Sequence, residues 1–262
     1  MILLAACLLN SCHVDLMGFF GSNDLDTRLY NADELLYPDK SQQTLSLGDS
    51  YSFLVLADTH IEKKDALGLE KLKDVIAAED KFVVICGDIS QTGYKIELEK
   101  FIEVADSWGV PCFPVIGNHD VYSDNWNNWR DIIGATRYRI DSDTASLFVL
   151  DSANCYFGDE QLDWLDKELK SRKERVFVFT HADLFMEDTL QFQQFTDVRE
   201  RARLISILKG RCDIMFMGHS HMGYEKKAGG IQFINLEDYV KGRAYCRVKV
   251  SPQGISLEYK KL

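Results

Sequence analysis

The chain has 262 residues, of which 46% are hydrophobic and 27% are charged. These values are ordinary for a globular protein with one large α/β core, and no segment marks a second core. The formal net charge of −11 and the pI near 5.0 argue against a nucleic-acid partner, because binding to the phosphate backbone needs a basic surface.

The N-terminus carries a short apolar run, Met1–Leu9, that is too short to span a bilayer. Followed by Asn10-Ser11-Cys12, it resembles a bacterial lipoprotein signal, in which Cys12 would be lipidated. Two features depart from that pattern: no Lys or Arg precedes the run, and Asn10 is unusually polar. We expect residues 1–12 to be a signal segment and the protein to be exported and anchored to a membrane. The alternative is an apolar terminus on a cytoplasmic protein.

Residues 13–48 are polar and only weakly periodic, which predicts a tether or an extension lying on the domain. Phe19, Phe20 and the Leu35-Leu36 pair indicate that part of this segment packs. We place the catalytic or binding domain at residues 49–262.

The seven cysteines do not form the C-x-x-C pairs that build zinc sites. Cys86, Cys112 and Cys212 lie in or beside predicted core strands, where a free thiol behaves as a small hydrophobic group. We therefore expect buried free thiols and no disulfide scaffold.

Five short apolar runs each end in a side chain that can bind a metal. Such runs, separated by helical stretches, predict parallel strands that are buried on both faces. The carboxyl ends of parallel strands face one crevice, so these side chains should converge. The runs are Phe53–Ala57 before Asp58-Thr59-His60, Phe82–Cys86 before Gly87-Asp88, Phe113–Ile116 before Gly117-Asn118-His119-Asp120, Val176–Thr180 before His181, and Ile214–Met217 before Gly218-His219-Ser220-His221. Five of the six histidines fall in these blocks, and His13 in the extension is the exception.

The remaining elements follow from apolar spacing. Helices are predicted around Leu69–Ile76, Leu98–Ala105, Leu162–Leu169 with Asp159 as its cap, and Leu204–Leu208 ending at Gly210. Strands are predicted at Arg137–Ile140 and Ser146–Leu150. The pattern of the C-terminal region predicts a second, largely antiparallel sheet made of Ile231–Leu236, Tyr245–Val250 and Ile255–Tyr259.

The clustered side chains are carboxylates, a carboxamide and imidazoles, without a thiolate. This mixture suits manganese, iron or zinc, and it is too large for one tetrahedral ion. Two divalent ions sharing a bridging carboxylate and a bridging hydroxide are the arrangement used for phosphoryl hydrolysis. One histidine should stay unligated to protonate the departing alkoxide. The residues alone do not indicate which histidine that is.

In order and in residue type, the five blocks resemble the signature of the calcineurin-like metallophosphoesterases, from about Ser52 to the C-terminus. Gly158 with Gln161-Leu162-x-Trp164-Leu165 also resembles a helix opening of that family. The resemblance implies an α/β fold, a four-layer α-β-β-α sandwich with two mixed β-sheets flanked by helices.

The resemblance also implies a role for each residue. The first ion would be held by Asp58, His60 and His221, and the second by Asn118, His181 and His219, with Asp88 as the bridge between them. His119 would be the general acid, and Asp120 would orient its ring.

We therefore expect metal-dependent hydrolysis of a small phosphate ester, either a diester or a monoester, by a metal-bridging hydroxide with His119 as the general acid. Diesters and monoesters are not separated by the motifs, because both reactions use the same metal core. The alternative is a non-catalytic metal-binding scaffold that uses the fold to recognise a partner. Such relatives lose the acid histidine or several ligands, whereas this chain has all of them.

Aromatic residues near these blocks have two interpretations. Tyr122, Trp126 and Trp129 either line a substrate cleft or pack a helix onto the core. A second set either forms a lid over the metals or packs on the surface: Phe185, Met186, Phe192 and Phe195. Arg130 and Arg137 are interpreted as surface residues.

Overall fold

The computed structural model describes residues 24–63, 65–186 and 194–262. Cys12, His13, Phe19, Phe20 and Phe192 lie outside the described residues, so lipidation and export stay predictions. Among the described residues, no helix combines the length and apolar character needed to cross a membrane.

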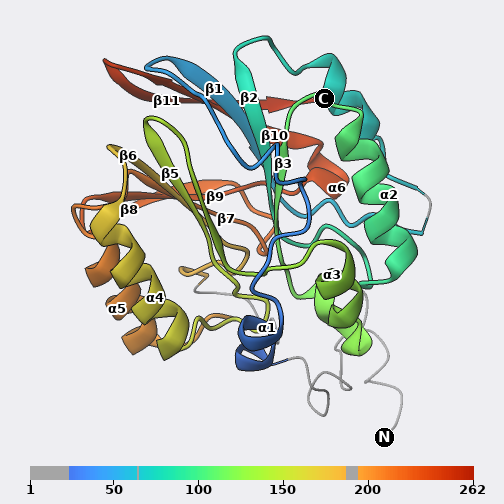
Figure 1. Cartoon of the computed structure of the whole chain (residues 1–262), viewed down its shortest axis with the longest axis horizontal. Helices are drawn as coiled ribbons and strands as arrows, with labels where there is room; N and C mark the ends of the chain where they lie inside the picture. The colour runs from blue at the N-terminus through green and yellow to red at the C-terminus, as the bar shows by residue number, and fades with distance from the viewer. Residues whose placement is uncertain (1–23, 64, 187–193) are drawn as a thin grey trace, which may run out of the picture.

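Two mixed β-sheets form the centre of the fold (Figure 1). The five-stranded sheet has the order β11-β10-β1-β2-β3, built from β1 (Tyr51–Leu56), β2 (Asp80–Cys86), β3 (Cys112–Val115), β10 (Ala244–Ser251) and β11 (Gly254–Lys261). The six-stranded sheet has the order β4-β5-β6-β7-β9-β8, built from β4 (Tyr138–Asp141), β5 (Ala145–Val149), β6 (Arg175–Phe179), β7 (Ile214–Met217), β8 (Tyr224–Ala228) and β9 (Ile231–Asn235). In each sheet the metal-site strands run parallel: β1, β2 and β3 in the first, β6 and β7 in the second.

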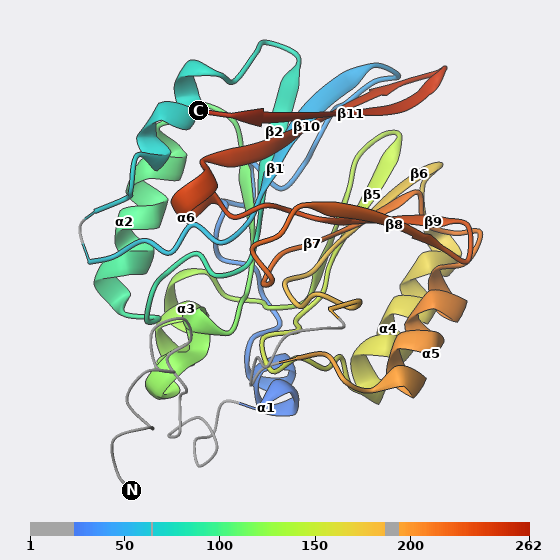
Figure 2. The same ribbon diagram turned by 180° about the vertical axis from the view of Figure 1, so that it is seen from behind.

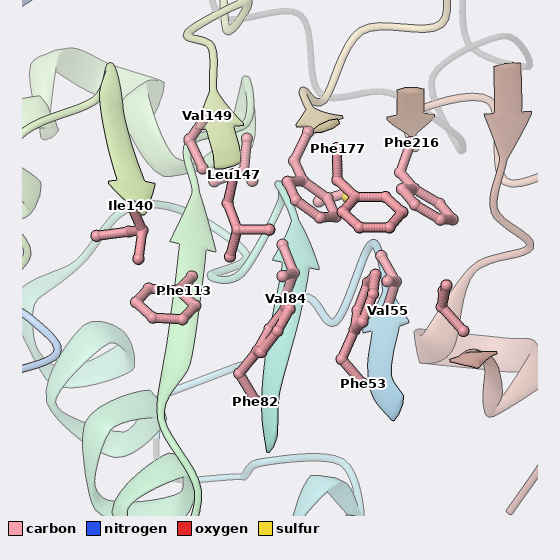
Figure 3. Packing of buried hydrophobic residues seen from close by; sticks show 14 of the residues in the cluster. Phe53, Val55, Phe82, Val84, Phe113, Ile140, Leu147, Val149, Phe177 and Phe216 are labelled. Carbon is pink, nitrogen blue, oxygen red and sulfur yellow. The ribbon is translucent and has the colours of Figure 1, made fainter. Parts of the chain in front are cut away.

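An aromatic core fills the space between the two sheets (Figure 3). Phe53 of β1 stacks on Phe82 of β2 with ring centroids 4.5 Å apart, and it meets the edge of Phe177 of β6 at 5.1 Å. Because helices cover the opposite face, every residue of β1 is buried. This explains why the strand is a continuous apolar run and does not alternate.

Helices cover the two outer faces, which gives the predicted four-layer sandwich (Figures 1 and 2). The outer face of the five-stranded sheet packs on the 3₁₀ helix η1 (Leu69–Asp74), α2 (Lys95–Asp106) and α3 (Trp126–Ile132). The outer face of the six-stranded sheet packs on α4 (Asp159–Glu168), η3 (Leu169–Ser171) and α5 (Val198–Leu208). The remaining helices are α1 (Leu25–Asn31), η2 (His119–Asp124) and α6 (Tyr239–Gly242).

The prediction of a separate C-terminal antiparallel sheet is wrong. β9 joins the six-stranded sheet parallel to β7, whereas β10 and β11 extend the other sheet from the edge of β1. The chain changes sheets through α6, and local apolar patterning does not specify which free sheet edge a strand will pair with. Two smaller corrections concern helices. The segment around Leu69 is a six-residue 3₁₀ helix, and Gly158, not Asp159, is the N-cap of α4.

The described part of the N-terminal extension packs on the domain. Leu35 joins the core between the sheets, whereas Leu36 is exposed. Arg28 of α1 is fully buried and forms a two-pronged ion pair with Asp151, with Nε–Oδ2 and Nη2–Oδ1 distances of 2.7 Å. Asp151 lies two residues beyond the end of β5, so the extension is attached at the carboxyl end of that strand.

The cysteine prediction is confirmed for the residues that the structure describes. Cys86, Cys112, Cys155 and Cys246 are buried free thiols, and Cys212 is a partly buried one.

We predict that Arg28→Met lowers the free energy of unfolding by about 3–5 kcal/mol, because it leaves the Asp151 carboxylate buried without its partner. Urea unfolding followed by circular dichroism measures the change. The control is Arg203→Met, which breaks ion pairs with the exposed Asp159 and Asp163 and should cost less than about 1 kcal/mol. Equal losses in the two variants would contradict the anchoring role of Arg28.

Candidate metal centre

The structure brings the predicted ligands together at the carboxyl ends of five strands from both sheets. Three groups of side chains each place their potential ligand atoms within 4.8 Å of one another. The groups are Asp58, His60 and His221; Asp88, His181 and His219; and His60, Asp88 and His119. Asp88 and His60 each belong to two of the groups, and only Asp88 of these two has a pair of carboxylate oxygens with which to bridge two ions.

The second predicted donor set is tightly convergent. Asn118 Oδ1 lies 2.9 Å from His181 Nε2 and 3.0 Å from His219 Nδ1, and those two nitrogens are 3.2 Å apart. His181 Nδ1 lies 3.0 Å from the carbonyl oxygen of Cys86. Because a carbonyl can only accept, Nδ1 carries a proton, and Nε2 is the nitrogen that faces the centre.

The first predicted donor set is joined to the second through the two oxygens of Asp88. Oδ2 lies 3.7 Å from His60 Nε2, whereas Oδ1 lies 3.3 Å from His181 Nε2. His221 Nε2 completes the set at 3.4 Å from Asp58 Oδ1.

His60 gives the clearest sign that a cation belongs here. The residue is buried, yet neither ring nitrogen has a hydrogen-bond partner in the part of the chain that the structure describes. Buried polar atoms are normally paired, because leaving them unpaired costs free energy. A divalent ion between His60, Asp58 and Asp88 would satisfy Nε2, so these residues fit the two-ion centre that the sequence predicts.

Backbone conformation aims the ligands into the centre. Five of the seven predicted ligands have φ in the left-handed region: Asp58 at 56°, His60 at 45°, Asp88 at 49°, His219 at 74° and His221 at 59°. This region is sparsely populated by residues other than glycine, and such conformations concentrate at functional sites. These five residues follow β1, β2 and β7, where the left-handed backbone turns the chain sharply beside the donor sets.

His119 lies at the edge of the donor sets, with Nε2 3.9 Å from Asp88 Oδ2. Its Nδ1 lies 2.8 Å from the carbonyl oxygen of Gln91, and its ring packs on Tyr122 with centroids 4.3 Å apart. These two contacts fix the ring.

The predicted role of Asp120 as the group that orients the His119 ring is wrong. Among the described residues, no hydrogen bond joins its carboxylate to that ring. The Asp120 carboxylate instead accepts from the backbone nitrogens of Gly117 and Ser90, at 2.9 and 2.8 Å, and from Ser90 Oγ at 2.7 Å. It therefore ties the loop after β3 to the loop after β2, while the Gln91 carbonyl holds the ring.

The model of the calcineurin-like phosphoesterase family matches residues 51–223, which contain all the predicted ligands. The chain belongs to the calcineurin-like phosphoesterase family. It is therefore a metal-dependent hydrolase of phosphoric esters.

Two further comparisons agree with this assignment. A protein of Fibrobacter succinogenes named as a probable cyclic nucleotide phosphodiesterase is 25% identical over 185 residues, which cover 63% of this chain and 71% of the relative. A dimetal phosphatase from Danio rerio shares the fold with a TM-score of 0.63 and 15% identity, over 80% of this chain and 96% of that chain.

The fold also occurs in a larger phosphatase and in a protein that is not named as an enzyme. The purple acid phosphatase PPD1 of yellow lupin has a TM-score of 0.65 and 15% identity over 81% of this chain, which covers 51% of the lupin chain. GAP50 of Plasmodium, described as the anchor in the inner membrane complex, has a TM-score of 0.61 and 15% identity over 81% of this chain and 84% of its own. At these identities the likeness shows the fold alone.

Burial and opposite charge shift the pKa values of the predicted metal ligands. Burial alone would raise the pKa of Asp88, but the neighbouring His181 and His119 outweigh it and hold that pKa well below the usual value. Burial alone would lower the pKa of His181, but the Asp88 carboxylate outweighs it and raises that pKa to about 9. Burial lowers the pKa of His60 to about 4. A cation that binds to His181 near neutral pH must therefore displace a proton.

Several residues that support the phosphoesterase site were missed in the sequence. The Gln91 carbonyl holds His119, and Ser152 Oγ accepts from the backbone nitrogens of His181 and Ala182, at 3.2 and 2.8 Å. Asp238 Oδ2 lies 3.4 Å from His221 Nδ1. These contacts join segments far apart in the chain, and no local motif marks them.

The aromatic alternatives are resolved in favour of packing for most residues. Trp126 and Trp129 are buried in the core on the outer face of the five-stranded sheet. Phe185 packs on Phe233 at 5.1 Å and Phe195 on Phe157 at 5.3 Å. Tyr122 differs, because it contacts both His119 and Asn118. Arg130 is exposed and pairs with Asp131, as expected of a surface arginine, whereas Arg137 is mostly buried, pairs with Glu160 and lies over the Trp164 ring.

Gly117 of the phosphoesterase signature is required by close packing. A Cβ at this position would lie 2.2 Å from the backbone nitrogen of Asp88 and 2.3 Å from its Oδ1. These separations are far inside contact distance, so Asp88 would have to move.

We predict that Gly117→Ala weakens metal binding on the order of 10-fold or more, the size of effect seen when groups that orient metal ligands are removed. Elemental analysis of the dialysed protein gives the number of retained ions, and circular dichroism checks the fold. Gly223→Ala is the control, because its Cβ would meet Glu237 at an ordinary 3.4 Å. Full retention of both ions by Gly117→Ala would refute the steric explanation.

Proposed function

We propose that this phosphoesterase hydrolyses a small phosphate ester, with a preference for diesters, at a centre of two divalent ions. The observation that carries the proposal is the Asp88 carboxylate, which faces the two donor sets with different oxygens. When bound, the ions lower the pKa of water and neutralise charge that develops on the phosphoryl oxygens.

The donor sets divide the ligands as follows. Asp58, His60 and His221 hold the first ion, Asn118, His181 and His219 hold the second, and Asp88 is shared. All of the ligand atoms are oxygen or imidazole nitrogen, which suits manganese, iron or zinc.

His119 is the general acid in this proposal. A carbonyl oxygen faces its Nδ1, so Nδ1 keeps its proton throughout and the exchangeable proton sits on Nε2. Nε2 is the nitrogen that faces Asp88 and the centre. A protonated Nε2 would donate to the leaving alkoxide, and the packed Tyr122 ring would keep the imidazole in that orientation.

Two observations support a small diester as the substrate. The relative from Fibrobacter succinogenes is named as a probable cyclic nucleotide phosphodiesterase. The net charge of −11 disfavours long polyanionic nucleic acids, which need many cationic contacts.

We expect the purified protein loaded with manganese, iron or zinc to hydrolyse bis-p-nitrophenyl phosphate faster than p-nitrophenyl phosphate. Release of p-nitrophenol from each ester, with and without metal removal by a chelator, gives the comparison. Faster monoester turnover would overturn the diester preference and make the protein a phosphatase. No turnover of either ester by protein carrying two ions would instead support the non-catalytic scaffold.

We predict that His119→Ala keeps both ions but loses about 10²–10⁴-fold in turnover of esters with poor leaving groups, the contribution of a general acid. Turnover of p-nitrophenol esters by His119→Ala should fall less, because that leaving group needs little protonation. Parallel assays on a cyclic nucleotide, which has a poor leaving group, and on bis-p-nitrophenyl phosphate, which has a good one, measure the difference, with metal content determined alongside. Loss of bound metal equal to the loss of turnover would contradict the assignment of His119 as the acid.

A further inference from the structure

His221 is the most weakly enclosed of the ligands in the proposed first donor set. Its side chain is 34% exposed, whereas those of Asp58 and His60 are 0% and 6% exposed. Packing alone therefore restrains the His221 ring less than the others. The ring must be held by a polar contact if Nε2 is to stay aligned with Asp58.

Asp238 provides such a contact from outside the family signature. It is buried, and its Oδ2 lies 3.4 Å from His221 Nδ1, on the opposite side of the ring from Asp58. Its other oxygen, Oδ1, accepts from the backbone nitrogens of Lys241 and Gly242, at 2.8 and 2.9 Å, and so caps α6. One carboxylate thus joins the helix to the histidine.

The helix that carries Asp238 is fixed to the same strand end as the first donor set. The backbone nitrogens of Tyr239 and Val240 donate to the carbonyl oxygens of Ala57 and Asp58, at 2.9 and 3.0 Å. The Tyr239 side chain is fully buried, and its hydroxyl donates to the Gly68 carbonyl at 2.9 Å. Asp238 is therefore held at a set position relative to Asp58.

We propose that Asp238 is a positioning residue for the first ion, an inference that rests on the proposed two-ion centre. Its carboxylate oxygen can only accept and faces Nδ1 at 3.4 Å, so it favours the proton of His221 on Nδ1 and leaves the Nε2 lone pair for the ion. A carboxylate behind a ligating histidine also raises the basicity of the ring. The second donor set is held differently, since the Cys86 carbonyl accepts from His181. Loss of Asp238 should thus affect one ion and not the other.

Asp238→Asn tests this role without removing the helix cap, because Asn caps helices as well as Asp does. With the amide oxygen in the cap, the amide nitrogen faces His221 Nδ1 and donates to it. That contact favours the proton on Nε2, the atom that should bind the ion. We expect affinity for the first Zn²⁺ site to fall by about 10–100-fold and the second to stay unchanged, measured by calorimetric titration of the metal-free protein.

The matched control is Asp197→Asn. Asp197 caps α5 through the backbone nitrogens of Arg199 and Glu200, so the chemical change is the same. It should leave both affinities unchanged. Long-range ¹H–¹⁵N spectra of the zinc-loaded protein should show Nδ1–H on His221 in the parent and a weakened zinc signature at that ring in Asp238→Asn.

If Asp238→Asn fails to fold, Asp238→Ser serves, because a serine hydroxyl retains the cap and removes the group facing His221. Unchanged affinity at the first site in a folded variant, or equal weakening of the two sites, would overturn the inference. The proposed function could also fail separately. If the protein binds two ions, Asp238→Asn weakens only the first, and neither test ester is hydrolysed, then the proposed function is wrong and the role of Asp238 is confirmed.

Discussion

The buried carboxylate of Asp88 is the constraint around which the centre is arranged. It is almost fully enclosed, and a buried charge is tolerated only when hydrogen bonds and opposite charges surround it. The His119 backbone nitrogen donates to Oδ1 at 2.9 Å, and the His181 ring faces the same oxygen. The His60 ring faces Oδ2. Segments from three strand ends thus meet on one side chain, and that side chain is the one that two ions could share.

The packing of the two sheets makes this meeting possible. The ligands come from β1, β2 and β3 in one sheet and from β6 and β7 in the other, so neither sheet could build the centre alone. The aromatic core around Phe53 and Phe177 lies between the sheets and holds them face to face (Figure 3). The extension adds to this through Arg28, whose partner Asp151 precedes Ser152, the residue that holds the loop of His181.

Different groups behind the ligands give the two halves of the centre different character. A neutral carbonyl, that of Cys86, holds His181, and another, that of Gln91, holds His119. A carboxylate, Asp238, faces His221. Within the described residues, Asp120 forms no hydrogen bond to a ligand ring but ties the loop after β2 to the loop after β3. Burial and the charge of Asp88 raise the pKa of Asp120 to about 7. The signature residues are the predicted ligands, whereas the Cys86 and Gln91 carbonyls and Asp238, which stand behind them, lie outside it.

The sequence by itself determined the strand ends, the ligand types and, through the family resemblance, the four-layer fold. The apolar runs reflect the burial of each strand on both faces, a requirement that each segment carries in its own residues. Tertiary structure alone decided that β10 and β11 join the sheet of β1, that Asp120 faces Ser90 and not the His119 ring, and that Asp238 stands behind His221. Each of these depends on which distant segment packs alongside, and that choice is made by the whole chain and not by neighbouring residues.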